Sequence, residues 1–553
     1  MATQSLRPTL FNSRRGRILL ENITAYLFLA PAGLLIFIFG IFPVGFAFFV
    51  SLHRWRRFPE ENRGLDTYVD ALGNLAYVLF FWIAIGLLVY GLISLWHLYR
   101  EAREDWRGLL YIVPAAASTA LVLAFTNWFF ILLPVVLDVP RRLRGERIEE
   151  GTFVNEFLAS FRFPNVLAAA DTFWLTLLVA VVLTGAFVAL IRTPRRGHYL
   201  FVSLVALLAL SSGVLFMQLT LAEIDTAIAE ARANNQSLPI WSQIILISAG
   251  VGLLYTAYLV WQQIHTVSTN RRFFLQALAV ILLMVGGVVL IVELPQALNE
   301  ADEDIMRGFS VTIMYSIFSI PLQLSIGLGL AVLLFQKIKF KSLFRVIYFM
   351  PYITPFVASS VVFTLLFSHR TGSPANRLLT LLGIETQNWL LEPKGIFEII
   401  FGPSTPEFLA GPGLALMVII LFNVWVYAGY STVIFLAGLG NIPQELYEAA
   451  RIDGASGWSS FRFITLPLLS PTTFFLTLIA TIGTFQAFTQ IFLLRRAGAY
   501  ASVDTINLYI YQEISGSNPD YAYGSAMAFV LFAVILALTL FQNRFVGRRV
   551  FYG

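Results

Sequence analysis

The sequence predicts an all-α membrane protein that crosses the lipid bilayer about twelve times. Of its 553 residues, 58% are hydrophobic and only 12% are charged, whereas about 25% of the residues of a soluble protein are charged. Apolar runs recur along the chain, and each is long enough to cross a hydrocarbon layer of about 30 Å at about 1.5 Å per residue. The chain has no cysteine, which excludes disulfides and cysteine–metal sites. Many membrane spans therefore fit better than one large globular domain.

The first membrane helix is predicted at residues 24–52. The preceding segment, 1–23, is polar and rich in arginine, and is predicted to be a cytoplasmic tail. Arg14-Arg15 before an apolar run also suggests a twin-arginine signal. However, the apolar run is far longer than the ~7–15 residues of a signal's apolar region. The run therefore predicts a retained helix.

Eleven further apolar runs predict the remaining membrane helices. They lie near residues 75–98, 108–137, 171–193, 199–219, 240–262, 273–294, 309–335, 343–368, 412–438, 470–492 and 524–545. Together with the first helix they make an even number, so both chain termini are predicted to face the cytoplasm.

Loop charge supports this orientation, because positively charged loops stay in the cytoplasm. The basic segments that fall inside are 192–196, 271–272, 337–341 and 544–549. The acidic loops 220–239 and 295–308 fall outside. The arginine-rich loop 138–170 also falls outside, against the rule. Either it lies in the membrane interface or one neighbouring span is miscounted.

A polar stretch, 441–467, separates two of the apolar runs: NIPQELYEAARIDGASGWSSFRFITLP. Asn441 and Gln444 have the spacing of a capping box at a helix start. Gly454 interrupts this helix, and a second short helix is predicted from Ser456 to about Phe463. The stretch therefore predicts two short helices, set at an angle on the membrane surface.

Spacing within this stretch resembles the EAA loop of ABC-importer permeases, the binding-protein-dependent (MetI-like) family. Glu448-Ala449-Ala450 is followed, after three intervening residues, by Gly454 and then, after nine intervening residues, by Ile464-x-Leu466-Pro467. In that family the loop is a coupling helix that docks on the cytoplasmic ATPase. The resemblance implies this role for Glu448, Ala449, Ala450, Arg451, Asp453, Gly454, Leu466 and Pro467. The alternative is a solvated loop in which Glu448 and Arg451 form an exposed ion pair, worth about 0.2–0.5 kcal/mol.

The resemblance extends to both ends of the chain, but not to its middle. LAPAGLLIFIFGIFPVGFAFFVSL in the first helix, and the region from Gly308 to the terminal GRRVFYG, look like a carbohydrate-type, maltose-type permease. The resemblance implies a type I importer core at 306–546 that contains the coupling loop 441–467, with helix 24–52 wrapping the core. About six helices in 75–294 show no such resemblance and have no assigned role, and their few polar residues predict a position peripheral to the transport pathway.

Partners and location follow from the same resemblance. It implies a second permease subunit, two cytoplasmic ATP-binding subunits, an extracytoplasmic solute-binding protein and surrounding lipid, in the plasma membrane of a prokaryote. ATP-driven closure of the ATPases would open the permease outward by alternating access. The sequence shows no basic stripe that would bind nucleic acid.

Enzyme chemistry finds no support in the sequence. There is no P-loop motif, so ATP hydrolysis is expected on a separate subunit. The five histidines lack metal-ligand spacing. No catalytic residue, metal or cofactor is therefore predicted. A twelve-span secondary transporter is the alternative from another class, but the spans carry few of the titratable groups that proton coupling needs.

Uncharged polar residues in two core helices predict the substrate pocket. Asn423, Tyr427 and Tyr430 recur at i, i+4 and i+7, which places them on one helix face. Thr481 and Thr484 share a face with Thr477 on the next predicted core helix, and Gln486 lies nearby. Such groups suit an uncharged, hydroxyl-rich solute. The alternative is that they only join helices, at about 0.6 kcal/mol per hydrogen bond.

The resemblance refines this pocket. Tyr430 aligns with a tyrosine that contacts substrate in the maltose permease, whereas Ala480 and Thr484 replace a serine and an asparagine. Arg495-Arg496 also stands where relatives often have a Gly-Gly-Pro turn. The resemblance therefore implies a sugar or oligosaccharide of open identity, with another small solute as the alternative.

Overall fold

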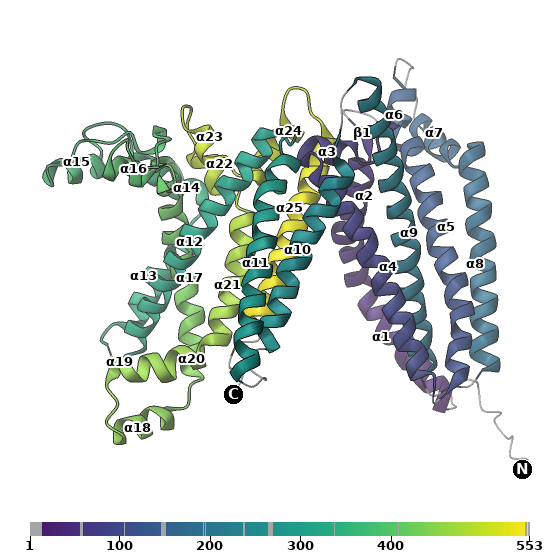
Figure 1. The fold of residues 1–553 in the computed structure, drawn as a ribbon, viewed down its shortest axis with the longest axis horizontal. Coiled ribbons are helices and arrows are strands. Elements are labelled where there is room, and N and C mark those ends of the chain that lie inside the picture. The colour runs from purple at the N-terminus through teal and green to yellow at the C-terminus, as the bar shows by residue number, and fades with distance from the viewer. Residues whose placement is uncertain are drawn as a thin grey trace, which may run out of the picture. The chain divides into compact units, whose positions relative to one another are not determined.

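The computed structural model describes residues 14–55, 59–103, 105–144, 151–191, 193, 195–235, 238–263, 269–336, 338–406, 409–547 and 550. Helices dominate this part of the chain, which confirms the predicted all-α class (Figure 1). The described strands, β1 (His53–Trp55) and β2 (Pro59–Asn62), pair antiparallel as one short hairpin. By internal contacts the chain divides into two compact units, Met1–Thr67 with Leu79–Leu238 and Tyr68–Val78 with Pro239–Gly553. Most of the predicted N-terminal tail lies outside the described residues.

The first unit consists of long apolar helices and short connections. Its helices are α1 (Arg14–Ile36), α2 (Phe42–Ser51), α5 (Ile112–Leu137), α6 (Val139–Arg142), α7 (Thr152–Ser160), α8 (Pro164–Leu190), α9 (Arg196–Ala233) and most of α4 (Leu75–Glu101). A π-helical turn joins α1 to α2, and Pro43 starts α2, where its missing N–H costs little. The predicted first span is thus one continuous apolar helix, Thr24–Ser51.

Two of the first unit's helices have other limits than the sequence predicted. Helix α8 begins at Pro164, because proline is favoured in a first helical turn. Helix α9 continues to Ala233 through most of the predicted acidic loop 220–239. The residues after 219 are rich in alanine and glutamate, which have high helix propensity.

Arg142, in the predicted arginine-rich loop, is bonded within its own unit. Its guanidinium donates to the Val135 carbonyl at 2.7 Å and to the Ser160 hydroxyl at 2.8 Å, and pairs with Glu156 at 3.4 Å. Helix α7 supplies both Ser160 and Glu156. Arg142 therefore has a local structural role that a count of loop charges does not reveal. Arg147 lies outside the described residues.

The second unit contains the region predicted as the transport core. Its helices are α10 (Ile240–Gln263), α11 (Thr269–Ala297), α12 (Glu303–Phe335), α13 (Lys341–Ile353), α14 (Phe356–Leu366), α15 (Pro374–Leu381), α16 (Ile396–Phe401), α17 (Leu414–Gly440), α18 (Gln444–Ile452), α19 (Gly457–Ser460), α20 (Leu466–Leu468), α21 (Ser470–Phe485), α22 (Thr489–Leu494), α23 (Tyr500–Val503), α24 (Ile506–Ser515), α25 (Tyr521–Phe541) and most of α3 (Asp66–Leu72). Helix α17 is the most buried of its membrane helices. It packs against α12, α13 and α21.

Gly429 lets α13 approach α17 closely. A Cβ atom added at Gly429 would lie 1.8 Å from the Tyr348 carbonyl oxygen, so only glycine fits without a backbone shift. This contact sets α13 against the α17 face on which Tyr427 and Tyr430 lie. The backbone of α17 thereby helps to shape the interior of the unit.

Two apolar runs that were each predicted as one helix are instead broken. The predicted helix 343–368 is the pair α13 and α14, bent by 96°, because a residue before proline is disfavoured in helical conformation and Thr354 precedes Pro355. The predicted helix 470–492 ends at Phe485, and α22 begins four residues later.

The number of spans agrees with the prediction of about twelve. The described residues include ten helices long and apolar enough to cross a membrane, and up to twelve if each of two bent helix pairs is one span. The second bent pair is Gly457–Leu468 with α21, at 62°. The chain is a multi-pass membrane protein.

Candidate functional site: a coupling loop and an interior cavity

The stretch 441–467 forms short helices across one end of the second unit. In Figure 1, α18 and α19 lie at the end of this unit opposite to α15 and α16, and run across the direction of α17. A π-helical turn, Phe461–Thr465, and α20 then lead into α21. The two predicted short helices are confirmed.

The start of the first short helix differs from the prediction. Asn441 ends α17, where its backbone N–H donates to the Gly438 and Leu439 carbonyls, and does not cap α18. Helix α18 starts after Pro443, whose extended backbone breaks the chain's helical path. The side-chain amide of Gln444 donates to Glu448 Oε1 at 2.8 Å. Proline thus separates two helices where the sequence pattern suggested a capping box.

The turn between α18 and α19 is as predicted. Gly454 has a φ of +76°, a left-handed conformation that glycine adopts without strain. The Ser456 side chain then caps α19 by accepting from the backbone N–H of Ser459 at 3.1 Å. Gly454 therefore ends α18, and Ser456 fixes the start of the next helix.

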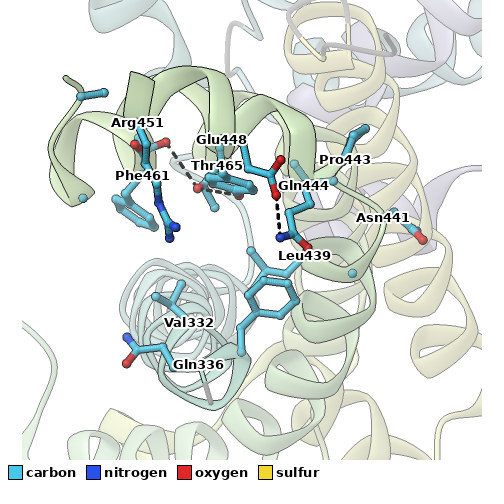
Figure 2. A pocket seen from close by; sticks show the side chains of 17 residues that line it. Val332, Gln336, Leu439, Asn441, Pro443, Gln444, Glu448, Arg451, Phe461 and Thr465 are labelled. Carbon is cyan, nitrogen blue, oxygen red and sulfur yellow. Dashed lines mark hydrogen bonds between the residues drawn. The ribbon is translucent and has the colours of Figure 1, made fainter. Parts of the chain in front are cut away.

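The predicted coupling residues lie mostly on the surface. Those that are exposed are Glu448, Ala449, Arg451, Asp453, Gly454, Leu466 and Pro467, while Ala450 is half-buried. Among the described residues, Glu448 and Arg451 form no ion pair, and Arg451 points toward Val332 of α12 and Gln336, which follows α12 (Figure 2). The ion pair of the solvated-loop alternative is therefore not formed, while the choice between a coupling loop and a solvated loop stays a prediction. Ile452, 87% exposed, and Trp458, 68% exposed, add apolar surface to the loop.

A cavity of about 790 Å³ lies between this loop and the ends of α12 and α17 (Figure 2). Its lining mixes apolar side chains from α12 and α17 with polar side chains from α18. Tyr447 lines it and bonds across to Thr465, with 3.0 Å between the two hydroxyl oxygens.

A second cavity, of about 210 Å³, lies between α12, α13, α17 and α21. Its lining residues are Gln323, Tyr352, Asn423, Tyr427, Tyr430, Ser431, Leu476, Ile479, Ala480, Gly483 and Thr484. None of them carries a formal charge. Four of the six predicted pocket residues are therefore together, namely Asn423, Tyr427, Tyr430 and Thr484.

The other two predicted pocket residues lie outside this lining. Thr481 turns away from the cavity and accepts a hydrogen bond from the Gln542 side chain at 2.9 Å. The residues of α21 that line the cavity are Leu476, Ile479, Ala480, Gly483 and Thr484, so of the predicted threonine face only Thr484 reaches the cavity. Gln486 is exposed because it follows the last residue of α21.

Tyr352, Gln323 and Ser431 line the cavity but were not predicted. Tyr352 stacks on Tyr430 with ring centroids 4.9 Å apart, and its ring meets Tyr427 edge-on at 5.9 Å. Asn423 donates to Gln323 Oε1 at 3.2 Å. The Pro351-Tyr352 sequence just before Pro355 was a usable signal, because prolines mark a break where side chains of a span can turn inward.

These features define a helical membrane transporter subunit with an interior polar cavity and a surface loop between two of its core helices. The chain belongs to the family described as "Binding-protein-dependent transport system inner membrane component", which matches residues 323–552. The chain is thus a transport component rather than an enzyme, and ATP hydrolysis in such systems belongs to a separate subunit.

Curated relatives support this assignment. The chain is 35% identical to the arabinooligosaccharides transport system permease protein AraP of Halalkalibacterium halodurans over 43% of this chain and 69% of that protein. It is 31% identical to the lactose transport system permease protein LacF of Rhizobium radiobacter over 42% and 72%. It is 28% identical to the sn-glycerol-3-phosphate transport system permease protein UgpA of Agrobacterium fabrum over 46% and 79%.

Proposed function

We propose that this chain is the permease through which an ABC importer moves an uncharged sugar or oligosaccharide across a prokaryotic plasma membrane. The observation that carries the proposal is the chemistry of the interior cavity. Its lining offers tyrosine rings, amides and hydroxyls and no charged side chain. Tyrosine rings suit the apolar faces of sugar rings, while amides and hydroxyls exchange hydrogen bonds with sugar hydroxyl groups.

The cavity's size limits what it holds. At about 210 Å³ it is smaller than the ~300–1,000 Å³ of most ligand pockets. A single sugar ring or one end of an oligosaccharide is therefore the expected occupant in this conformation. Names of relatives point the same way, since two of the three transport arabinooligosaccharides or lactose.

An anionic solute is the second candidate, because one relative is named for sn-glycerol-3-phosphate. A phosphate ester would normally be held by arginine, lysine or helix N-termini. Arg495 and Arg496 are the nearest arginines in sequence to the cavity-lining part of α21. Arg495 pairs with Asp504 at 2.9 Å, and Arg496 donates to the Thr364 hydroxyl at 3.0 Å. Both guanidinium groups are thus committed elsewhere, which favours a neutral solute.

The loop 441–467 is proposed to couple this cavity to ATP hydrolysis. Its exposed short helices, with Ile452 and Trp458 uncovered, suit docking into a groove of a cytoplasmic ATPase. The proposed assembly has a second permease, two ATPase subunits and an extracytoplasmic binding protein. The loop and both termini of the chain would then face the cytoplasm.

Competitive uptake tests the substrate. Cells expressing the importer take up a labelled arabinooligosaccharide while unlabelled arabinooligosaccharides, lactose, maltose, sn-glycerol-3-phosphate, amino acids and phosphate compete in turn. We expect only neutral sugars to reduce the uptake of the label. Competition by sn-glycerol-3-phosphate or phosphate alone would contradict the neutral-sugar proposal while leaving the permease family unaffected.

A further inference from the structure

A single pair of hydroxyl groups joins α18 to the segment that enters α21. The phenol oxygen of Tyr447 lies 3.0 Å from Thr465 Oγ1. Thr465 is the last residue of the π-helical turn and is buried, and Tyr447 is half-buried in the middle of α18. Tyr447 and Thr465 are 18 residues apart in sequence, so this bond closes the loop upon itself.

Thr465 also has a second polar neighbour. Thr465 Oγ1 lies 3.4 Å from the Ser460 carbonyl oxygen, to which it can only donate. In the shorter contact between Tyr447 and Thr465, either hydroxyl can be the donor. The two contacts of Thr465 connect α18 with both ends of the π-helical turn.

A cavity beside the pair leaves α18 with few packing contacts, so this hydrogen bond matters for the position of α18. The cavity of about 790 Å³ separates α18 from the end of α12 (Figure 2), and Tyr447 is among the residues that line it. Close packing, which holds most helices in place, is interrupted there. Pro443 and Gly454 bound α18 at its two ends as chain breaks. The position of α18 thus depends strongly on the Tyr447 side chain.

On the other side of the pair, Thr465 stands next to a bend. Its carbonyl accepts from the Leu469 N–H at 2.9 Å, directly before α21. The helical segment Gly457–Leu468 meets α21 at 62°. Helix α21 then supplies Ala480 and Thr484 to the lining of the interior cavity. π-Helical turns are frequent at functional sites.

We propose that the Tyr447–Thr465 pair is a positioning pair that transmits displacement of α18 to α21, and so to the interior cavity. Tyr447 and Thr465 touch neither solute nor nucleotide, and act by holding the two coupling segments at a fixed separation. This inference rests on the proposed coupling role of the loop 441–467.

The first measurement is of the distance between the two coupling segments, and it needs neither solute nor partner subunits. Because the chain has no cysteine, Glu445→Cys and Arg462→Cys give two unique, exposed sites for spin labels on the two sides of the pair. In the purified full chain we expect one narrow distance distribution. We expect Tyr447→Phe or Thr465→Val, added to the labelled chain, to shift or widen that distance distribution. The variant Thr465→Ser keeps the hydroxyl, and its distribution should match that of the labelled chain without further substitution.

The second measurement is of the coupling between ATP hydrolysis and transport. In the importer complex purified with this chain and placed in liposomes, arabinooligosaccharide imported per ATP hydrolysed is compared between variants. Tyr447→Phe keeps the ring and loses one hydroxyl, so we expect this ratio to fall about two- to tenfold, the factor that one lost hydrogen bond supplies. The double variant Tyr447→Phe/Thr465→Val should lose no more than either single variant, because both remove the same bond.

Thr477→Val is the matched control, since its hydroxyl bonds the Thr473 carbonyl of its own helix at 2.8 Å. Unchanged label distances in Tyr447→Phe, or changed distances with an unchanged import ratio, would overturn the inference. Effects that multiply in the double variant would do the same. An intact complex that imports no neutral sugar contradicts the proposed function instead, and the spin-label distances still test the pair.

Discussion

At the scale of single residues, the cavity's polar groups serve the fold and the cavity together. Thr484 accepts a hydrogen bond from the Ser316 hydroxyl at 2.9 Å and donates to the Thr481 carbonyl at 3.1 Å. Asn423 bonds Gln323 while both line the cavity. Helix-to-helix hydrogen bonding and solute binding are therefore not exclusive roles, because amide and hydroxyl groups have more than one hydrogen-bonding site.

Sequence periodicity predicted one wall of the cavity and missed the other. Asn423, Tyr427 and Tyr430 fall on one face because α17 is an unbroken helix. Tyr352 was missed because its span was predicted as one unbroken helix. Gln486 was included because the next helix was predicted to run to residue 492, past its end at Phe485. Local helix breaks depend on proline context and tertiary contacts, which hydrophobic patterns do not report.

Replacing Tyr430 by alanine or Thr484 by valine is predicted to impair solute uptake. Tyr430→Ala removes the ring that stacks on Tyr352. Thr484→Val removes the hydrogen bond to the Ser316 hydroxyl, which keeps only the Thr312 carbonyl as its acceptor. A lost hydrogen bond costs about 0.5–1.5 kcal/mol, which corresponds to uptake efficiency lower by about two- to tenfold. Labelled arabinooligosaccharide uptake at several concentrations measures the effect.

The control for this prediction is Thr477→Val on the same helix. Its hydroxyl bonds the Thr473 carbonyl of α21 at 2.8 Å, and Thr477 does not line the cavity. Uptake should stay near that of the unmodified protein. Equal losses in Thr477→Val and Thr484→Val would instead indicate that any hydroxyl removed from α21 disturbs the helix.

At the scale of helices, the chain's bends place side chains that straight spans would direct into lipid. The 96° bend between α13 and α14 accompanies Tyr352 in the cavity wall. At the 62° bend before α21, the chain passes from the surface loop into a membrane helix. The sequence predicted an angle between the two short helices at Gly454, but neither of these two bends. Glycine and polar residues thus carried information that apolar run length lacked.

The coupling loop yields a prediction about Glu448 and Gly454. Glu448→Ala removes an exposed carboxylate that accepts from Gln444, and is expected to leave the protein inserted while separating ATP hydrolysis from transport. Gly454→Ala forces a Cβ into a left-handed conformation that costs about 1–2 kcal/mol. Open space surrounds Gly454, so this cost is conformational rather than a clash. Uptake and ATPase co-purification are measured for each variant.

Two further substitutions make this test specific. Gly454→Asn should transport better than Gly454→Ala, because asparagine tolerates left-handed backbone. Gly457→Ala should be nearly silent, since Gly457 opens α19 and an added Cβ meets nothing within 4 Å. Normal uptake with normal ATPase co-purification in both Glu448→Ala and Gly454→Ala would remove the basis for a coupling role.

At the scale of the whole chain, contact grouping and family resemblance divide the sequence differently. The segment 75–294 was predicted as one added block of about six helices. By contacts, α10 and α11 group with the second unit, whereas α5, α8 and α9 group with the N-terminal helices. The family match covers 323–552 alone. The boundaries 24–52, 75–294 and 306–546 therefore remain predictions, since an unmatched sequence offers no motif from which to assign its packing.

Polar groups inside the first unit are mostly bonded within their own helices. Thr119 donates to the Ala115 carbonyl at 2.9 Å on α5, and Thr220 donates to the Phe216 carbonyl at 2.8 Å on α9. Such bonds satisfy a hydroxyl without a partner from another helix or from solute. This pattern supports the prediction that these helices lie outside the solute pathway.

Solute protection of engineered cysteines tests that prediction directly, because the natural chain has none. Ser431→Cys places a thiol in the interior cavity, while Ser118→Cys and Ser211→Cys place thiols on α5 and α9 of the first unit. With an arabinooligosaccharide at ten times its Kd, about nine in ten sites are filled, so a small thiol reagent should modify Ser431→Cys about tenfold more slowly. The rates at the other two positions should not change. Protection at Ser118→Cys or Ser211→Cys, with none at Ser431→Cys, would place the solute pathway in the N-terminal helices and contradict the cavity assignment.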